Sequence, residues 1–196
     1  TILPEKLVGA GRKGQALREI ILCVDQSGSM GSSVVYSSVF AAVLASLPSV
    51  KTQLVLFDTS VVDMTKDLDD PVDLLFGVQL GGGTDIGKAL NYITQLIRNP
   101  SDTIIVLISD LYEGGNVKTM LKKAASIKES GVQFITLLAL NDEGAPSYDR
   151  NIAVEFAKMG IPAFACTPNL FPDLMASAIK KEDISGFLSK NGLTPK

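Results

Sequence analysis

Three oxygen-bearing side chains stand at alternate positions in the stretch VDQSGSM, residues 24–30. Asp25, Ser27 and Ser29 are each separated by one residue, and Gly28 lies between the two serines. In an extended loop this spacing sends the three side chains to the same side, while the glycine lets the backbone curl. Three roles fit such a loop: a helix cap, a nucleophile, or part of an oxygen cage for a metal ion.

Two further polar clusters supply partners for this loop. The glycine-rich segment GGGTD, residues 81–85, contains Thr84, and the apolar run TIIVLI leads into Ser109 and Asp110. Ligands of a doubly wound sheet bind beyond the carboxyl ends of its strands, so we expect all three clusters at that edge. Short Asp, Ser and Thr side chains suit the near-octahedral geometry that Mg²⁺ requires. The candidate metal ligands are Asp25, Ser27, Ser29, Thr84 and Asp110.

Only two of these candidates, Asp25 and Asp110, are anionic. A divalent ion held by them keeps residual positive charge and an open coordination position, which suits a carboxylate from another molecule. We expect Mg²⁺, with Mn²⁺ or Ca²⁺ as alternatives. The nearby acids Glu113, Asp142 and Glu143 are expected to be solvated loop charges. Their charge requires a basic collar on any partner that brings a carboxylate.

Each cluster also has a simpler interpretation. Asp25 and the serines could cap a helix that begins near Ser33. Thr84 or Asp85 could cap the helix that follows, and Asp110 could open a turn. Asp85 is therefore expected to be a cap or to lie behind the ligands. The metal site is favoured because all three clusters fall at one predicted edge.

The chain contains no histidine. This excludes Ser-His-Asp and Cys-His catalysis, and it removes most zinc sites, which rely on imidazole or clustered thiolates. A hydrolase or phosphatase with Asp25 or Ser27 as nucleophile is one alternative, but it lacks a nearby base or second acid. We therefore expect that the chain is not an enzyme.

The segment GGTDIGKA, residues 82–89, comes within one residue of a phosphate-binding loop. That pattern, G-x-x-x-x-G-K-[ST], ends in a hydroxyl that holds Mg²⁺, and Ala89 stands in its place. Nucleotide binding by this loop is a second alternative. It leaves Asp25, Ser27 and Ser29 without a role.

Composition indicates a globular chain. Of its 196 residues, 46% are hydrophobic and 20% are charged, enough for a sizeable core. The net charge of −3 offers no basic field for nucleic acid. The longest uncharged stretch, residues 26–50, is broken by glycines and a proline, so we expect no transmembrane segment and no membrane partner.

The elements that must position the clusters alternate in type. Short apolar runs rich in β-branched residues predict strands at Ile20–Val24, Gln53–Phe57, Thr103–Ser109, Val132–Leu140 and Ala163–Ala165. Apolar residues three or four apart predict amphipathic helices over 86–97, 117–127 and 152–159, the last capped by Ser147 or Asp149. This alternation predicts an α/β fold with a mostly parallel sheet and helices on both faces.

Two segments depart from this alternation. Residues 54–64 predict a hairpin, because Asp58–Ser60 is too short for a crossover, and its second strand should form an antiparallel edge. Residues 34–47 predict a helix that carries no charge on any face. We expect the N-terminal leader or the C-terminal segment to cover this helix, in preference to a partner protein.

The order D-x-S-x-S, then a separate Thr, then an Asp that ends a strand resembles the metal-ion-dependent adhesion site (MIDAS) of von Willebrand factor type A (VWA) domains. The matching positions are Asp25, Ser27, Ser29, Thr84 and Asp110. The resemblance implies a Rossmann-like, doubly wound sheet of six strands. It also implies a divalent ion whose coordination is completed by an acidic residue of a partner protein.

The segments GGGTDI and LISDLYEGG resemble sequences of the bacterial CoxE-like branch of this family, whose members are encoded beside MoxR-type AAA+ ATPases. That branch implies an adaptor that works with such an ATPase in assembling or maturing a target complex. The chain then divides into a leader or linker at 1–18, the VWA domain at 19–179 and a C-terminal polar segment at 180–196.

In a Rossmann-like strand order, Cys23 lies on a central strand and Cys166 near the far edge, about three strand spacings of roughly 4.8 Å away. This separation exceeds the reach of a disulfide. We therefore expect two free thiols in a reducing compartment, and hence a cytoplasmic location.

Overall fold

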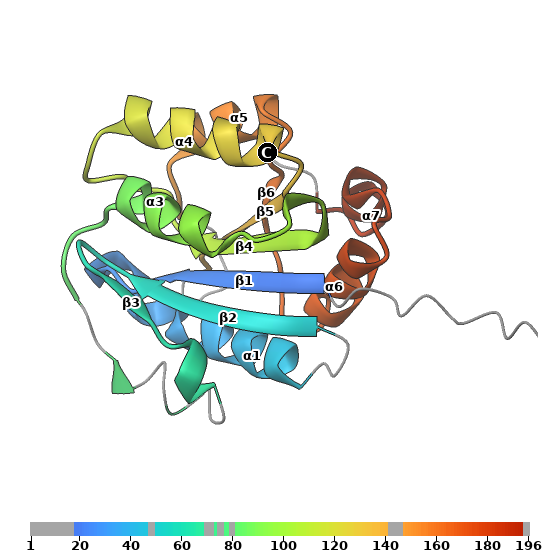
Figure 1. Ribbon diagram of the computed structural model, residues 1–196, viewed down its shortest axis with the longest axis horizontal. Helices are drawn as coiled ribbons and strands as arrows, with labels where there is room; N and C mark the ends of the chain where they lie inside the picture. The colour runs from blue at the N-terminus through green and yellow to red at the C-terminus, as the bar shows by residue number, and fades with distance from the viewer. Residues whose placement is uncertain are drawn as a thin grey trace, which may run out of the picture.

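The computed structural model describes residues 18–46, 50–68, 73, 77–78, 81–140 and 147–193. A six-stranded sheet lies between layers of helices, as Figure 1 shows. The strands are β1 Arg18–Asp25, β2 Val50–Phe57, β3 Val61–Asp63, β4 Thr103–Ser109, β5 Gln133–Leu138 and β6 Ala163–Ala165. The helices are α1 Val34–Ala45, α3 Ile86–Leu96, α4 Val117–Glu129, α5 Arg150–Lys158, α6 Phe171–Ile179 and α7 Ile184–Lys190.

The strand order is β3-β2-β1-β4-β5-β6, and each neighbouring pair is parallel except β2 and β3. Phe57 of β2 lies opposite Val61 of β3, so the predicted hairpin and its antiparallel edge strand are confirmed. The chain runs outward from β1 to β3 and then returns to the other side of β1 at β4. This confirms the doubly wound, Rossmann-like α/β fold and puts its switch point between β1 and β4.

The sheet is buried on both faces. Along β1, Leu22 and Val24 point into the core shared with α1, α6 and α7, whereas Ile21 and Cys23 point into the core shared with α3, α4 and α5. Figure 1 shows α1 below the sheet and α3 and α4 above it. Burial on both faces explains why the sequences of the central strands are continuous apolar runs.

Most predicted boundaries of strands and helices agree with the structure. The starts of β1 and β2 differ, and so does the buried face of α4. β1 and β2 begin earlier than predicted, because Arg18 pairs with Val50 through the backbone, which the apolar pattern does not report. In α4 the buried side chains are Met120, Ala124 and Ile127, whereas Val117 is 38% exposed in the first turn.

The uncharged helix α1 is covered by the C-terminal part of the chain. The rings of Phe40 in α1 and Phe171 in α6 have centroids 4.3 Å apart. Ile184 and Leu188 of α7 lie in the same core. The C-terminal cover is therefore confirmed, while the leader, residues 1–17, lies outside the described residues. The segment predicted as polar, 180–196, contains the helix α7, whose side chains Ile184 and Leu188 are buried.

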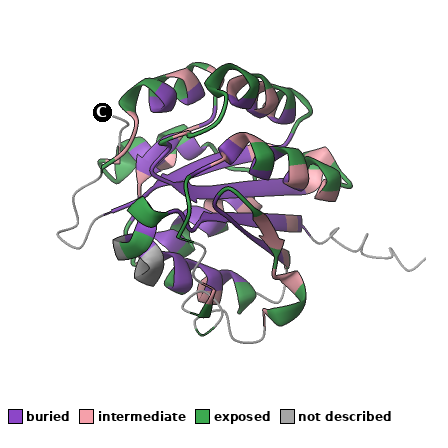
Figure 2. Cartoon of the chain, turned by 90° about the vertical axis from the view of Figure 1, so that its left-hand side faces the viewer, coloured by how far each residue is buried: buried purple, intermediate pink, exposed green. Residues whose placement is uncertain are grey.

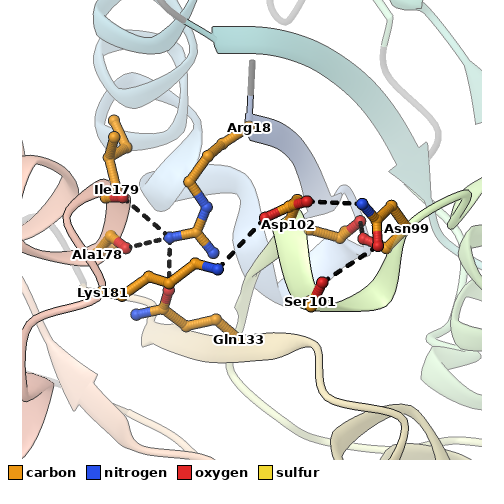
Figure 3. Close-up of polar contacts among 9 residues, drawn as sticks. Arg18, Asn99, Ser101, Asp102, Gln133, Ala178, Ile179 and Lys181 are labelled. Carbon is orange, nitrogen blue, oxygen red and sulfur yellow. Dashed lines mark hydrogen bonds and ion pairs between the residues drawn. The ribbon is translucent and has the colours of Figure 1, made fainter. Parts of the chain in front are cut away.

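A polar network fastens α6 at the amino edge of the sheet (Figure 3). Arg18 Nη1 donates to the carbonyl oxygens of Ala178 at 2.6 Å and Ile179 at 3.1 Å, and Lys181 pairs with Asp102 at 3.3 Å. Burial lowers the pKa of the Arg18 guanidinium, and Asp102 opposes this shift. A cation at the carboxyl end of a helix is stabilised by the helix dipole, so Arg18 anchors α6 to β1.

Both cysteines are free thiols and both are buried, as expected. Burial raises the pKa of the Cys166 thiol to about 12, and burial together with Asp25 raises that of Cys23. None of the helices in the described part of the chain has the length and hydrophobicity needed to span a bilayer.

Candidate metal site

Three loops meet at the carboxyl edge of the sheet, the edge that faces the viewer in Figure 2. Gly28 N donates to Gly82 O at 3.1 Å and Gly81 N to Gln26 O at 3.1 Å, which joins the loop after β1 to the glycine-rich loop. Gly114 N donates to Thr84 O at 2.9 Å, which joins the glycine-rich loop to the loop after β4. The fold therefore brings the three predicted clusters together through backbone contacts.

Asp25 ends β1 and is only 1% exposed. Its Oδ1 accepts a hydrogen bond from Ser27 N at 2.9 Å, and its Oδ2 accepts one from Ser109 Oγ at 2.7 Å. The alternative that Asp25 caps α1 is wrong, since no side chain caps that helix at Ser33, whose hydroxyl donates to Leu140 O.

The electrostatic setting of Asp25 disfavours a bare charge. Burial raises the pKa of the Asp25 carboxyl, the hydrogen bonds from Ser27 and Ser109 lower it, and the charge of Asp110 raises it. In the described part of the chain, neither Asp25 nor Asp110 forms an ion pair with a lysine or arginine. A bound cation would supply the missing positive charge.

The two serines lie beside each other. The Oγ atoms of Ser27 and Ser29 are 3.3 Å apart, with Ser27 buried and Ser29 exposed. The backbone is not extended here as expected, because a 3₁₀ helix begins at Gly28 and runs to Ser33. The hydroxyls nevertheless converge, since Met30 N donates to Ser27 O and tightens the turn.

Asp110 follows β4 and is 4% exposed. Its Oδ1 accepts a hydrogen bond from Tyr112 N at 3.2 Å, so it opens a turn as one alternative proposed. The next residue, Leu111, is fully buried and has a φ of 62°, a conformation that few non-glycine residues adopt. Ser29 and Asp110 line a common hollow of about 80 Å³, with Tyr112 and Leu140 also on its wall.

Thr84 is 8% exposed, and its carbonyl oxygen accepts a hydrogen bond from Gly114 N at 2.9 Å. Its carbonyl oxygen lies where a Cβ on Gly114 would approach to 2.7 Å, so this contact requires a glycine. Within the described residues, no hydrogen bond involves the Thr84 hydroxyl, which leaves it available as a ligand. Asp85 accepts a hydrogen bond from Lys88 N at 2.7 Å and so caps α3, as predicted.

Two carboxylates that support the site were missed or misread in the sequence. Asp58 accepts hydrogen bonds from Ser60 N at 2.6 Å and Gly82 N at 3.1 Å. It holds the glycine-rich loop, and its place at the carboxyl end of β2 was the available signal.

Glu113 is not the solvated charge that the sequence suggested. Its carboxylate accepts hydrogen bonds from Ile86 N and Gly115 N, both at 2.7 Å. Burial raises the pKa of Glu113, the two backbone donors lower it, and Asp85 raises it further. The unpaired N–H groups at the start of α3 explain this position. Asp142 and Glu143 lie outside the described residues.

The donor set fits a hard cation. It consists of hydroxyl and carboxylate oxygens, and no group of three or more His, Cys, Asp or Glu side chains suited to a metal occurs among the described residues. A site with two carboxylates and three hydroxyls suits Mg²⁺, which prefers oxygen and retains waters.

Comparison with known proteins identifies a family. A family model described as "VWA domain containing CoxE-like protein" matches residues 3–175. A protein of Escherichia coli K12, "Uncharacterized protein YehP", is 44% identical over 162 residues, which cover 83% of this chain and 43% of that protein. The chain thus spans less than half the length of this relative.

Solved structures share the fold. The crystal structure of an aerotolerance-related membrane protein from Bacteroides fragilis superposes with a TM-score of 0.62 at 19% identity, over 86% of this chain and 99% of that one. BatB of Bacteroides thetaiotaomicron gives a TM-score of 0.62 at 18% identity, over 84% and 100%. A von Willebrand factor type A structure from Catenulispora acidiphila gives 0.55 at 12% identity, over 80% and 40%.

Proposed function

Because the chain belongs to the family of VWA domain containing CoxE-like proteins, we propose that it binds a protein partner through a divalent metal ion. The observation that carries this proposal is the meeting of two buried carboxylates, Asp25 and Asp110, with no cationic side chain paired to either in the described part of the chain. A cation bound between the two would remove the cost of keeping both carboxylates ionised.

The residues proposed to hold the ion are Ser27, Ser29, Thr84, Asp110 and Asp25. Mg²⁺ is the proposed ion, with Mn²⁺ and Ca²⁺ as substitutes. When bound, it supplies a positive charge that attracts a carboxylate of the partner. The chain orients the metal ligands, since backbone hydrogen bonds between the three loops hold these ligands in place before the partner binds.

The geometry weighs against nucleotide binding at the glycine-rich loop. A phosphate would need the free N–H groups at the start of α3. Those groups are already taken, since Ile86 N donates to Glu113 and Lys88 N donates to Asp85. Lys88 Nζ donates to Thr59 O at 2.8 Å, so this amine is already engaged by the protein and is not free to bind a phosphate.

A hydrolase is also less well supported than a binding domain. Both carboxylate oxygens of Asp25 accept hydrogen bonds within the protein, and the residue is 1% exposed, so it is poorly placed as a nucleophile. The chain has no histidine to act as a general base for Ser27, and the carboxylate that contacts Ser27, Asp25, is buried with both oxygens already hydrogen-bonded. We therefore propose an interaction domain that is not an enzyme.

For the partner we propose a MoxR-type AAA+ ATPase in the cytoplasm, with this chain as the adaptor that recruits it to a complex under assembly or maturation. The support for this pairing is the resemblance of GGGTDI and LISDLYEGG to CoxE-like proteins that are encoded beside such ATPases. Because Asp85 and Glu113 add negative charge beside the site, we propose that the partner's carboxylate is flanked by basic side chains.

The test is direct binding between the purified chain and a purified MoxR-type ATPase of the same organism, measured by biolayer interferometry. The ATPase itself uses Mg²⁺ with nucleotide, so a chelator would also affect the partner. Variants of this chain are therefore used to test whether its metal site makes the contact. We expect Asp110→Ala to weaken binding at least tenfold.

The control is Asp67→Asn, an exposed carboxylate of the described chain away from the three loops. It should bind as the wild type does. Equal binding by wild type and Asp110→Ala would contradict a metal-bridged contact, and no binding by the wild type would contradict the choice of partner.

A further inference from the structure

The hydroxyl of Ser109 lies between the two loops that carry the carboxylates. Ser109 is the last residue of β4 and is fully buried. Its Oγ donates to Asp25 Oδ2 at 2.7 Å and accepts a hydrogen bond from Leu111 N at 3.0 Å. One hydroxyl therefore contacts the carboxylate that ends β1 and the backbone just beyond Asp110.

We propose that Ser109 is a positioning residue, which sets the Asp25 carboxylate and the Asp110 turn in one fixed arrangement toward a metal ion. This inference rests on the proposed function and deepens it. The D-x-S-x-S, Thr and Asp positions matched in the sequence do not include Ser109, although it directly precedes Asp110.

The contact with Asp25 fixes the rotation of its carboxylate. Ser27 N holds Oδ1 at 2.9 Å and Ser109 Oγ holds Oδ2 at 2.7 Å, so the two oxygens are oriented from opposite loops. Without Ser109, only Ser27 would orient the group. The polar groups behind a metal site usually change its affinity by about 10–100-fold when they are removed.

The contact with Leu111 stabilises a strained turn. Leu111 has a φ of 62° and is fully buried, so its backbone conformation must be held by its surroundings. Ser109 Oγ accepts the hydrogen bond from Leu111 N, and Asp149 N donates to Asp110 O at 2.9 Å from the opposite side. These bonds direct the Asp110 side chain, which starts one residue before the strained position.

The test uses Mn²⁺ alone as the probe, with free and bound ion distinguished by electron paramagnetic resonance. We expect Ser109→Ala to bind Mn²⁺ at least tenfold more weakly than the wild type, while Ser109→Thr, which keeps the hydroxyl, stays within threefold. A purely structural role would lower the Tm of Ser109→Ala without changing the Mn²⁺ affinity of the folded fraction.

The matched control is Thr103→Val at the other end of β4. Thr103 is also fully buried and its hydroxyl makes one hydrogen bond, to Asn99 O at 2.8 Å. This variant should lose stability but keep its Mn²⁺ affinity. If circular dichroism shows Ser109→Ala unfolded, Ser109→Cys, of similar size and a weak donor, takes its place with the same expected loss.

The outcomes separate the two proposals. No Mn²⁺ binding by the wild type overturns the proposed function itself. Binding by the wild type with a loss of less than tenfold in Ser109→Ala overturns the positioning role alone. So does a loss in Ser109→Thr as large as that in Ser109→Ala, because the hydroxyl would then not be the cause.

Discussion

Asp25 combines burial with a neighbouring negative charge, and both make its ionised form unfavourable in the metal-free protein. Burial is the largest effect and raises the pKa of Asp25, and the charge of Asp110 also raises it. The hydrogen bonds from Ser27 and Ser109 lower this pKa but do not cancel the rise. A residue with this environment lowers the stability of the fold at neutral pH unless a cation is present.

We predict that Asp25→Asn raises the Tm of the metal-free protein at pH 7, because it removes the buried charge while its amide oxygen accepts from Ser27 N and its amide nitrogen donates to Ser109 Oγ in the reverse direction. A gain of about 1 kcal/mol corresponds to a Tm about 2–4 °C higher for a chain of this size. The same variant should lose the stabilisation that Mn²⁺ gives the wild type. Differential scanning calorimetry with EDTA and with Mn²⁺ measures both effects.

Asp67→Asn, which removes an exposed charge, is the control for the general effect of charge removal. It should leave the Tm unchanged in both conditions. A lower Tm for Asp25→Asn in EDTA would mean that the ionised carboxylate stabilises the fold on its own, and the argument from charge would be wrong.

The three loops form one unit because backbone hydrogen bonds connect them. Gly28 is joined to Gly82, and Thr84 is joined to Gly114. The glycines at two of these contacts allow close approach, since a Cβ would lie 2.5 Å from Asp58 Oδ2 at Gly82 and 2.7 Å from Thr84 O at Gly114. Positions far apart in sequence are thus fixed relative to one another without a bound ligand.

We predict that Gly114→Ala weakens Mn²⁺ binding about tenfold or more, because the added methyl group must push the Thr84 loop away. Gly31→Ala is the matched control in the loop after β1, where a Cβ meets nothing within 4 Å. A Mn²⁺ titration of both variants tests the coupling. Unchanged affinity in Gly114→Ala would show that the position of Thr84 does not matter to the ion.

The sequence predicted the strands, the helices up to α5 and the meeting of the clusters, because these depend on local pattern, but it predicted neither α6 nor α7. Apolar runs and helical periods report burial directly, and the carboxyl ends of parallel strands must meet at one edge. The position of Asp58 at the end of β2 was open to prediction, but the backbone N–H groups that Asp58 and Glu113 bind were not, because these lie about 25 residues away in the chain. The 3₁₀ helix after Ser27 was also missed, since serines and glycines carry no periodic signal.

The molecule as a whole depends on its C-terminal helices. Helix α1 has no charged face, and α6 and α7 cover it in one core. Arg18 then fixes the carboxyl end of α6 at the sheet edge opposite the candidate site (Figure 3). The amino edge of the sheet therefore contributes to stability, whereas the carboxyl edge carries the proposed metal site.

We predict that Phe171→Ala lowers the free energy of unfolding by about 3–5 kcal/mol, because it leaves a cavity against Phe40. Urea denaturation measures this loss, and Val39→Ala, at a side chain that is 36% exposed on α1, should cost about 0.5 kcal/mol or less. Equal losses in the two variants would mean that α6 does not cover α1.

The measurement that tests the central claim most directly is a Mn²⁺ titration of the wild type and Asp110→Asn, followed by electron paramagnetic resonance. Asp110 supplies one of the two carboxylates of the proposed site, and Asp110→Asn removes its charge while keeping an oxygen that can accept from Tyr112 N. We predict one bound Mn²⁺ per wild-type chain and an affinity at least tenfold weaker in Asp110→Asn. Absence of Mn²⁺ binding by the wild type, or equal affinity in the variant, would contradict a metal site at this edge of the sheet.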